Sequence, residues 1–393
     1  MRAYALILVC VLVLGCIVDV ASELVLYRAG ETIAFDALIE RQRATDGLYF
    51  GVANPVGEYK LAAYALRKPE IVILGSSRAH RQHQEFYNRS SYSMSGLVLS
   101  PAGAFPVLDL LILIHKPRIV IFNVDFFSFC STSPLSAGGP RYARPIAAPS
   151  GVGWEKVNRF AVVPKLVSDG TLSPQDVADL ALGRTSDTTQ GTSLFGLIAI
   201  RRHMGFRLDG AIAEIDPRTQ DPNELEAAKR EVLTGARHYP TGCKYEPSAL
   251  AYLEMLQQEL TREGIRLVVL MPPVAPAIYR LFMTAPASIS GYYATVLRGL
   301  AERNFTDLHV LLDGGAIGAQ DSEFADAVHG GDISEARMLL KAAEAPGTIL
   351  AEIINRPFLE QLVHERSGML TVGISYLRAA EIAFHGRTIA ASK

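Results

Sequence analysis

The sequence predicts an α/β fold in which a parallel sheet is covered by helices on both faces. Three observations carry this prediction: short and mostly apolar runs, helical segments between them, and turn residues at the boundaries. Apolar runs of this kind are typical of strands that are buried on both sides. The predicted strands are residues 70–74, 91–97, 118–127, 265–271 and 307–312. Because helices join such strands, we expect a three-layer arrangement with residues 71–74 in its centre.

Two of the predicted helices are followed by a residue that typically ends a helix. Residues 107–115 are apolar and stop before Pro117, which cannot continue a helix. Apolar residues recur at helical spacing between 249 and 260, and Gly264 supplies a common terminator. The remaining helices are predicted at residues 78–85 and 333–343.

The pattern changes between the third and fourth predicted strands. Pro, Gly and Ser cluster in residues 131–153, and polar helical stretches follow, such as 223–237. We interpret residues 131–245 as a mainly helical insertion, which either shapes a substrate groove or is a structural elaboration without ligand contact. The insertion interrupts one α/β domain at 28–393, whose last part, 346–393, is a C-terminal extension.

The first 27 residues predict a membrane anchor or signal segment. Residues 3–18 are uncharged and almost wholly apolar. The run Val13-Leu14-Gly15-Cys16 resembles a bacterial lipobox, which would place a lipid on Cys16, and Val20-Ala21-Ser22 fits a cleavage site. The favoured interpretation is an uncleaved single-pass anchor. All three interpretations export the rest of the chain.

Composition limits the classes of function. The chain has 38 basic and 40 acidic residues, so it lacks the basic surplus of a nucleic-acid-binding protein. No Cys/His spacing resembles a zinc site, and we expect neither a metal nor a cofactor. His80 and His83 are interpreted as partly exposed or substrate-rim residues rather than as a metal pair. Cys130 and Cys243 form either a disulfide or two free thiols in an oxidising compartment.

Two motifs predict a serine acyl-transfer site. Gly75-Ser76-Ser77-Arg78 directly follows the first strand, and Asp326 and His329 are three residues apart in a late loop. A strand that runs into a Gly-Ser turn holds a hydroxyl at the carboxyl end of the sheet, where ligands bind in such folds. The pattern therefore predicts Ser77 as nucleophile, His329 as base and Asp326 as the residue that orients the base.

With these motifs the chain resembles the SGNH (GDSL-like) hydrolase superfamily. The likeness is strongest to its membrane-anchored bacterial branch, which is associated with O-acylation of exopolysaccharide and cell wall. It covers about residues 60–128 and 245–340. The resemblance implies a flavodoxin-like sheet, and in it Ser77, Asp326 and His329 take the catalytic positions. Ser76 stands where the family usually has Asp.

The resemblance also implies an oxyanion hole. Its donors would be the backbone N–H groups of Ser77 and Gly96 and the side-chain amide of Asn123. The strand reads Asn123-Val124-Asp125, and if Asp125 takes the amide's place, a carboxylate would oppose the oxyanion. Arg78 is expected either to bind an anionic sugar or phosphate or to form a structural ion pair.

Two functions follow from these expectations. The first is a periplasmic serine acyl esterase or O-acetyltransferase, held in a bacterial inner membrane and acting on a surface polysaccharide through an acyl-serine intermediate. A membrane-bound acyltransferase is a candidate partner, and no nucleic acid is expected. The second is a non-catalytic SGNH-like scaffold that binds polysaccharide or partners in an export complex.

Overall fold

The computed structural model describes residues 2–52, 56–130, 154–184, 188–189, 191–234, 244–284 and 288–380. The chain divides into two compact units, each built from two stretches of sequence. Unit 1 comprises Met1–Ala63 and Ile146–Leu208, and unit 2 comprises Tyr64–Pro145 and Asp209–Lys393. The division cuts through the expected insertion at 131–245, because the chain from Asp209 onward belongs with the sheet that carries Ser77.

Unit 1 contains short strands as well as helices. Leu48 and Tyr49 of β1 pair in parallel with Leu194 and Phe195 of β6, and Tyr49 also pairs antiparallel with Phe206 of β7. The strands are β1 (Leu48–Tyr49), β5 (Thr188–Thr189), β6 (Thr192–Phe195) and β7 (Met204–Phe206). The helices are α1 (Arg2–Arg28), α2 (Phe35–Thr45), α5 (Trp154–Ser168), α6 (Pro174–Ala181) and α7 (Leu197–Arg202). As expected, the described part of the segment 131–245 is mainly helical, with α5, α6, α7 and α8 (Pro222–Thr234). It also contains short strands, of which β6 and β7 pair with β1, far away in sequence.

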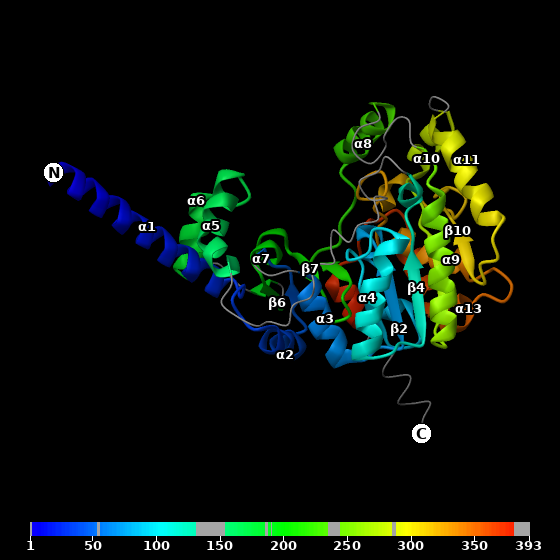
Figure 1. The fold of residues 1–393 in the computed structure, drawn as a ribbon, viewed down its shortest axis with the longest axis horizontal. Coiled ribbons are helices and arrows are strands. Elements are labelled where there is room, and N and C mark those ends of the chain that lie inside the picture. The colour runs from blue at the N-terminus through cyan, green and yellow to red at the C-terminus, as the bar shows by residue number, and fades with distance from the viewer. Residues whose placement is uncertain are drawn as a thin grey trace, which may run out of the picture. The chain divides into compact units, whose positions relative to one another are not determined.

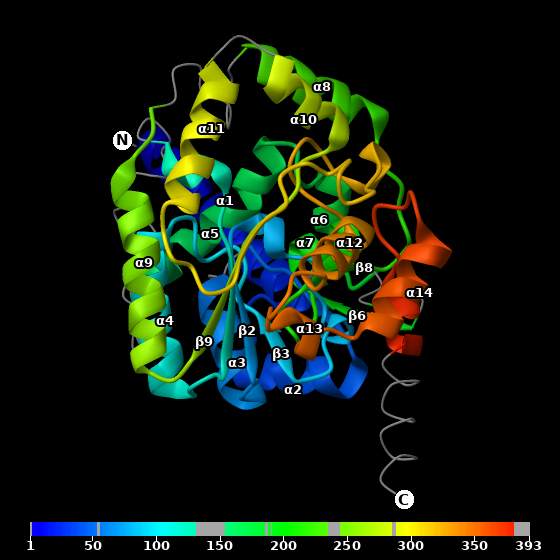
Figure 2. The ribbon, with the colours of Figure 1, turned by 90° about the vertical axis from the view of Figure 1, so that its right-hand side faces the viewer.

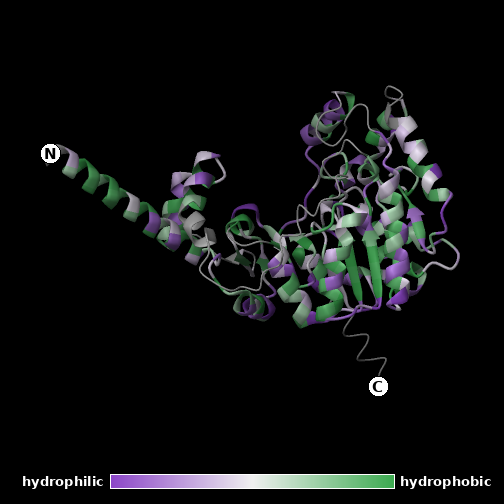
Figure 3. Ribbon diagram, in the orientation of Figure 1, coloured by the Kyte–Doolittle hydropathy of each residue, from purple (hydrophilic) through white to green (hydrophobic). Residues whose placement is uncertain are grey.

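Helix α1 is the one helix in the described part of the chain that is long and apolar enough to cross a membrane. Its apolar side chains are mostly exposed from Tyr4 to Val20, whereas Val25 and Leu26 are buried. Helices α5 and α6 pack against α1, and Figure 3 shows the apolar character of α1. A signal sequence has the same length and composition, so this helix fits each of the interpretations of residues 1–27.

Unit 2 contains the predicted parallel sheet. In its described residues the strand order is β10-β9-β4-β2-β3, and all four pairings are parallel. The strands are β2 (Ile71–Gly75), β3 (Ser91–Ser93), β4 (Ile119–Asn123), β9 (Arg266–Met271) and β10 (Leu308–Val310). The prediction of a parallel α/β sheet is confirmed. The middle strand is β4 rather than β2, which lies beside it (Figure 1).

Helices pack in pairs beside this sheet. Helix α4 contacts α9, and α12 contacts α14. In Figure 2, α4 and α9 lie to the left of the strands and α12 and α14 to the right. The helices of unit 2 are α4 (Pro101–Ile114), α8 (Pro222–Thr234), α9 (Pro247–Arg262), α10 (Pro276–Thr284), α11 (Ser288–Ala301), α12 (Asp332–Ala342), α13 (Leu350–Ile353) and α14 (Arg356–Arg366). A further strand, β8 (Ile212–Glu214), also belongs to this unit, and α3 (Val56–Arg67) spans the residue at which unit 1 ends.

The helix predicted at 78–85 does not form. The chain instead makes two 3-10 turns, Ser77–Ala79 and Gln84–Phe86. Side chains between them are buried against distant partners: Arg81 pairs with Glu214, and Gln82 bonds Asn123. These long-range polar contacts stabilise an irregular backbone. The local sequence carries no signal that predicts them.

The C-terminal extension belongs to unit 2 in its described part. The N–H of Leu370 donates to the carbonyl oxygen of Arg218, and the N–H of Val372 donates to the Asp332 carboxylate. Leu359 and Leu362 of α14 are fully buried. Residues beyond 345 therefore help to hold the start of α12, which directly follows the loop that carries His329.

The cysteines divide between the N-terminal helix α1 and the rest of the chain. Cys10 and Cys16 are free and exposed on α1. Cys130 is disulfide-bonded, and its backbone forms an antiparallel bridge with Tyr245. Cys243, the last of the four cysteines in the sequence, lies outside the described residues.

Candidate active site

Ser77 stands at the carboxyl end of β2 in a tight turn. The turn starts at Gly75, whose φ of +145° favours glycine. A Cβ on Gly75 would lie 2.8 Å from the Asn123 carbonyl oxygen on the neighbouring strand. Ser76 then caps the turn, because its hydroxyl accepts the N–H of Arg78. The result is a serine that is exposed although the strand before it is fully buried.

The structure brings Ser77, His329 and Asp326 into one chain of hydrogen bonds. Ser77 Oγ lies 2.7 Å from His329 Nε2, and His329 Nδ1 lies 2.7 Å from Asp326 Oδ2. The three side chains come from positions 77, 326 and 329, so only the fold places them together. The distances match those of a serine that is activated by an imidazole and an orienting carboxylate.

Asp326 is held ionised by its surroundings. Its Oδ1 accepts the backbone N–H groups of Val328 and His329, at 2.8 Å and 2.9 Å. Burial disfavours the charged form of Asp326, but the hydrogen bond and charge of His329 and the two backbone N–H groups outweigh it. The pKa of Asp326 therefore lies well below its ordinary value. A carboxylate that stays charged can fix the His329 tautomer over a wide pH range.

The loop that carries Asp326 and His329 is pinned at both ends. Phe324 and Gly330 form an antiparallel bridge, and the N–H of Ala325 donates to the His329 carbonyl oxygen at 2.8 Å. The N–H of Ala275 donates to the Ala327 carbonyl oxygen at 3.0 Å. The loop therefore behaves as a closed turn with few free backbone groups.

Arg78 does not point toward a substrate, so the expectation that it binds an anionic group is wrong. Its side chain and that of Asp125 are each 2% exposed, and Nη1 lies 3.1 Å from Asp125 Oδ1. The guanidinium also donates to the carbonyl oxygens of Val328, Pro272 and Pro273. Arg78 is thus the structural ion pair that was the alternative, and its charge neutralises Asp125, which does not stand as a bare carboxylate in the site.

The expected oxyanion donors Gly96 and Asn123 are bonded within the protein. The N–H of Gly96 donates to the Gly75 carbonyl oxygen at 2.8 Å. The buried Asn123 amide donates to the Leu74 carbonyl oxygen at 3.3 Å and accepts from Gln82 at 2.9 Å. The Gly96 N–H would have to leave its partner to meet an oxyanion, whereas the Asn123 amide group has a second N–H besides the one that meets Leu74. The three-donor hole therefore stays a prediction.

A buried polar network lies behind these residues, and no sequence pattern indicated it. Gln82 Nε2 donates to both Asn123 Oδ1 and Glu335 Oε2, at 2.9 Å and 3.0 Å, and Tyr87 donates its hydroxyl to Gln82 Oε1 at 2.7 Å. Burial raises the pKa of Glu335 to about 8, against the opposing effects of Gln82 and nearby arginines. The network joins the end of β4 to α12. With this raised pKa, the side chain of Glu335 is mainly uncharged at neutral pH.

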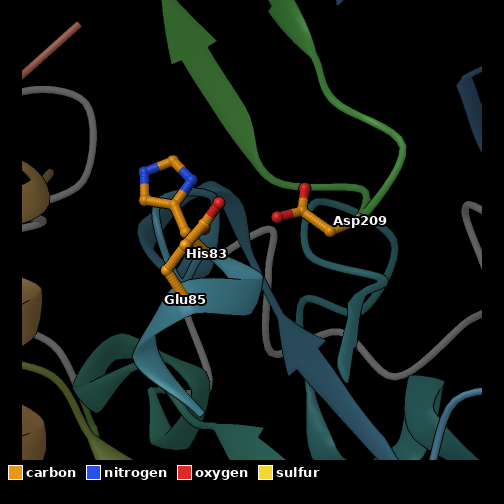
Figure 4. Close-up of side chains that lie close together, drawn as sticks. All are labelled: His83, Glu85 and Asp209. Carbon is orange, nitrogen blue, oxygen red and sulfur yellow. The ribbon is translucent and has the colours of Figure 1, made fainter. Parts of the chain in front are cut away.

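His83 does not lie at the substrate rim, as its position in the sequence had suggested. It is fully buried, and its Nε2 lies 3.0 Å from Asp332 Oδ1. Figure 4 shows its imidazole near the carboxylates of Glu85 and Asp209, and one donor atom from each lies within 4.8 Å of the others. These residue types can hold a metal ion. The Asp209 oxygens, however, accept the N–H groups of Gln84 and Ala211, so the cluster is satisfied in part by the protein.

The arrangement around Ser77 can activate a hydroxyl for attack on an acyl carbon. The same constellation serves hydrolysis and acyl transfer, since only the acceptor differs. No family model matches the chain, and comparisons with curated proteins and with solved structures give no match.

Proposed function

We propose that this protein is a serine acyl esterase or O-acyltransferase of SGNH (GDSL-like) type. One observation carries the proposal: the hydrogen-bonded series Ser77 Oγ, His329 Nε2, His329 Nδ1 and Asp326 Oδ2, with both links at 2.7 Å. The parallel sheet, with helix pairs beside it, is consistent with the three-layer SGNH arrangement. The order Ser, Asp, His along the chain is also the order expected for the superfamily that the chain resembles.

The chemistry follows from the three side chains. Ser77 Oγ attacks the ester carbonyl carbon while His329 Nε2 takes the hydroxyl proton, and Asp326 stabilises the imidazolium. The tetrahedral intermediate collapses, the C–O bond to the leaving alcohol breaks, and His329 returns the proton to that alcohol. Water or a sugar hydroxyl then attacks the acyl-Ser77 ester, with His329 again as base. Water gives an esterase, and a sugar hydroxyl gives a transferase.

The cellular setting is proposed on separate grounds. Helix α1 would hold the protein in a bacterial inner membrane, with the rest of the chain in the periplasm. The disulfide at Cys130 fits an oxidising compartment. The resemblance favours a surface polysaccharide as substrate, and a membrane-bound acyltransferase as the source of acyl groups if the reaction is a transfer.

The proposal is tested on the full chain in detergent with p-nitrophenyl acetate and a fluorophosphonate probe, which labels activated serines. We expect the wild type to release p-nitrophenol and to be labelled, and Ser77→Ala to do neither. Ser168→Ala is the matched control, because it removes an exposed hydroxyl that donates to the Lys165 carbonyl oxygen within α5, and it should leave labelling in place. Equal hydrolysis by wild type and Ser77→Ala would refute the serine mechanism.

A second function is favoured by one observation. The Gly96 N–H is already bonded within the protein, as it would be in a scaffold that never stabilises an oxyanion. A non-catalytic protein of this fold would bind polysaccharide or partners in an export complex. Retention of polysaccharide by a chain that neither hydrolyses esters nor reacts with the probe would favour this function.

A further inference from the structure

A cavity of about 410 Å³ adjoins the acidic end of the triad. Helix α8 forms one wall, and residues Asp326, Ala327 and Val328 form another. The volume lies in the range of small-molecule sites. Asp326 lines this cavity and also belongs to the hydrogen-bonded triad with His329 and Ser77. Its side chain is 36% exposed. We call this cavity the α8 pocket.

The charged residues that line the α8 pocket are mostly acidic. Among the described lining residues one is basic, Arg230, and four are acidic: Asp221, Glu224, Glu231 and Asp326. Three of the four acidic residues have partners within the protein, since Asp326 bonds His329, Asp221 accepts the N–H of Asn223 at the start of α8, and Glu231 has an interaction of its own. Glu224, in the first turn of α8, is exposed. Carboxylate oxygens accept hydrogen bonds from hydroxyl and ammonium groups and repel anions.

We infer that the α8 pocket binds the sugar part of the substrate and selects a glycan unit without acidic groups. The inference rests on the proposed function, because the pocket and the triad share Asp326. Sugar hydroxyls can donate to Glu224 and its neighbours, and an amino group gains a further favourable charge. A uronic acid, sulfate or phosphate on the same sugar meets an excess of negative charge. The pocket therefore separates acidic from non-acidic polysaccharides.

The test uses three matched O-acetylated sugars with the full chain in detergent: a methyl glucoside, a methyl glucosaminide and a methyl glucuronoside. Acetate release gives kcat/KM for each, and the ratio of glucuronoside to glucoside is the readout. We expect the wild type to disfavour the glucuronoside by about tenfold, the effect of about 1.4 kcal/mol. The glucosaminide should be cleaved at least as well as the glucoside. Added salt should reduce this discrimination.

Glu224→Lys should raise the glucuronoside-to-glucoside ratio by about tenfold, and Glu224→Gln should raise it less. Each ratio compares two substrates on one preparation, so a partly unfolded variant does not distort it. The matched control is Glu226→Lys. It makes the same charge change on an exposed part of α8 that does not line the pocket, where Glu226 pairs with Lys229. Glu226→Lys should leave the ratio unchanged.

The possible failures are distinguishable. If the wild type cleaves all three sugars through Ser77 but does not disfavour the glucuronoside, the inference is overturned and the proposed function stands. The same holds if Glu224→Lys and Glu226→Lys shift the ratio equally, because the effect is then one of net charge. If no ester is cleaved and the fluorophosphonate does not react, the proposed function fails and the inference fails with it.

Discussion

Arg78 Nε donates to the carbonyl oxygen of Val328 at 2.9 Å, which joins the residue after the nucleophile to the residue before the base. The same guanidinium reaches Asp125 after β4 and the two prolines after β9. One buried side chain thus connects three strand ends with the loop of the triad. We therefore expect the distance between Ser77 Oγ and His329 Nε2 to depend on this connection.

Replacing Arg78 should therefore impair turnover without removing a group that touches substrate. A lysine keeps the charge, but it lacks the planar fork that meets several acceptors at once. We expect Arg78→Lys to lower kcat by about 100-fold, the usual cost of a misplaced catalytic group, with a smaller change in KM. The control is Arg89→Lys, which alters a partly exposed ion pair with Glu70. A wild-type kcat in Arg78→Lys would show that the contacts of Arg78 do not position the triad.

The triad should act as one unit in a mutant cycle. His329→Ala should be nearly as severe as Ser77→Ala, because His329 is the base that the Ser77 hydroxyl contacts. Asp326→Ala should be milder, since the imidazole keeps some basicity without its orienting carboxylate. The double variant with both His329 and Asp326 replaced should be no slower than His329→Ala alone. Additive losses, measured as kcat on an acetyl ester, would mean that the three residues act separately.

Glu335 should make stability fall as pH rises. Its pKa is raised from 4.5 in the unfolded chain to about 8 in the folded protein, because it is buried beside Gln82. Between these values the folded state holds a proton that the unfolded state has lost. The free energy of unfolding therefore decreases by up to about 1.4 kcal/mol per pH unit from this group. Glu335→Gln keeps an acceptor for Gln82 and should flatten the dependence of denaturant unfolding between pH 5 and pH 8. An unchanged slope would contradict the buried neutral acid.

Gly75 should be intolerant of a side chain. A Cβ there would meet the Asn123 carbonyl oxygen and Cβ at 2.8 Å and 2.9 Å, and a φ of +145° is itself strained for alanine. We expect Gly75→Ala to destabilise the protein by about 1–3 kcal/mol and to displace Ser77. Gly103→Ala in α4 is the control, because its nearest contact is Ser100 Oγ at 3.5 Å and alanine favours a helix. Thermal unfolding of the two variants compares them, and equal melting temperatures would argue against the strained turn.

The parts of the fold that could be predicted are those with local signals. Strands β2, β4 and β9 are continuous apolar runs, because both of their faces are buried, and the sequence shows this directly. The residues of the triad could be picked out because a turn after a strand and an Asp-x-x-His are short patterns. Their placement at the same edge of the sheet follows from the parallel order of the strands, which alternation with helices predicts. The 2.7 Å contact between Ser77 Oγ and His329 Nε2 is seen only in the structure.

The parts that could not be predicted depend on distant partners. Arg78 is a charged residue next to a nucleophile, which by itself suggests a substrate ligand. Its structural role is visible only from its contacts with the buried Asp125 and three carbonyl groups. The backbone from 78 to 85 is irregular because its buried polar side chains bond partners that lie far away in sequence, among them Asn123, Glu214 and Asp332. Strands β6 and β7 are held by β1, which lies far away in sequence. Sequence periodicity carries no signal for contacts of this kind.

The central claim is that Ser77 becomes acylated during turnover. It is tested most directly by mixing the full chain with p-nitrophenyl acetate, quenching in acid within the first turnover, and mapping acetyl groups by mass spectrometry. We predict one acetyl group on Ser77 in the wild type, and none on that residue in His329→Ala under the same conditions. Ester turnover without an acetyl group on Ser77, or equal acetylation of Ser76 and Ser77, would contradict the account.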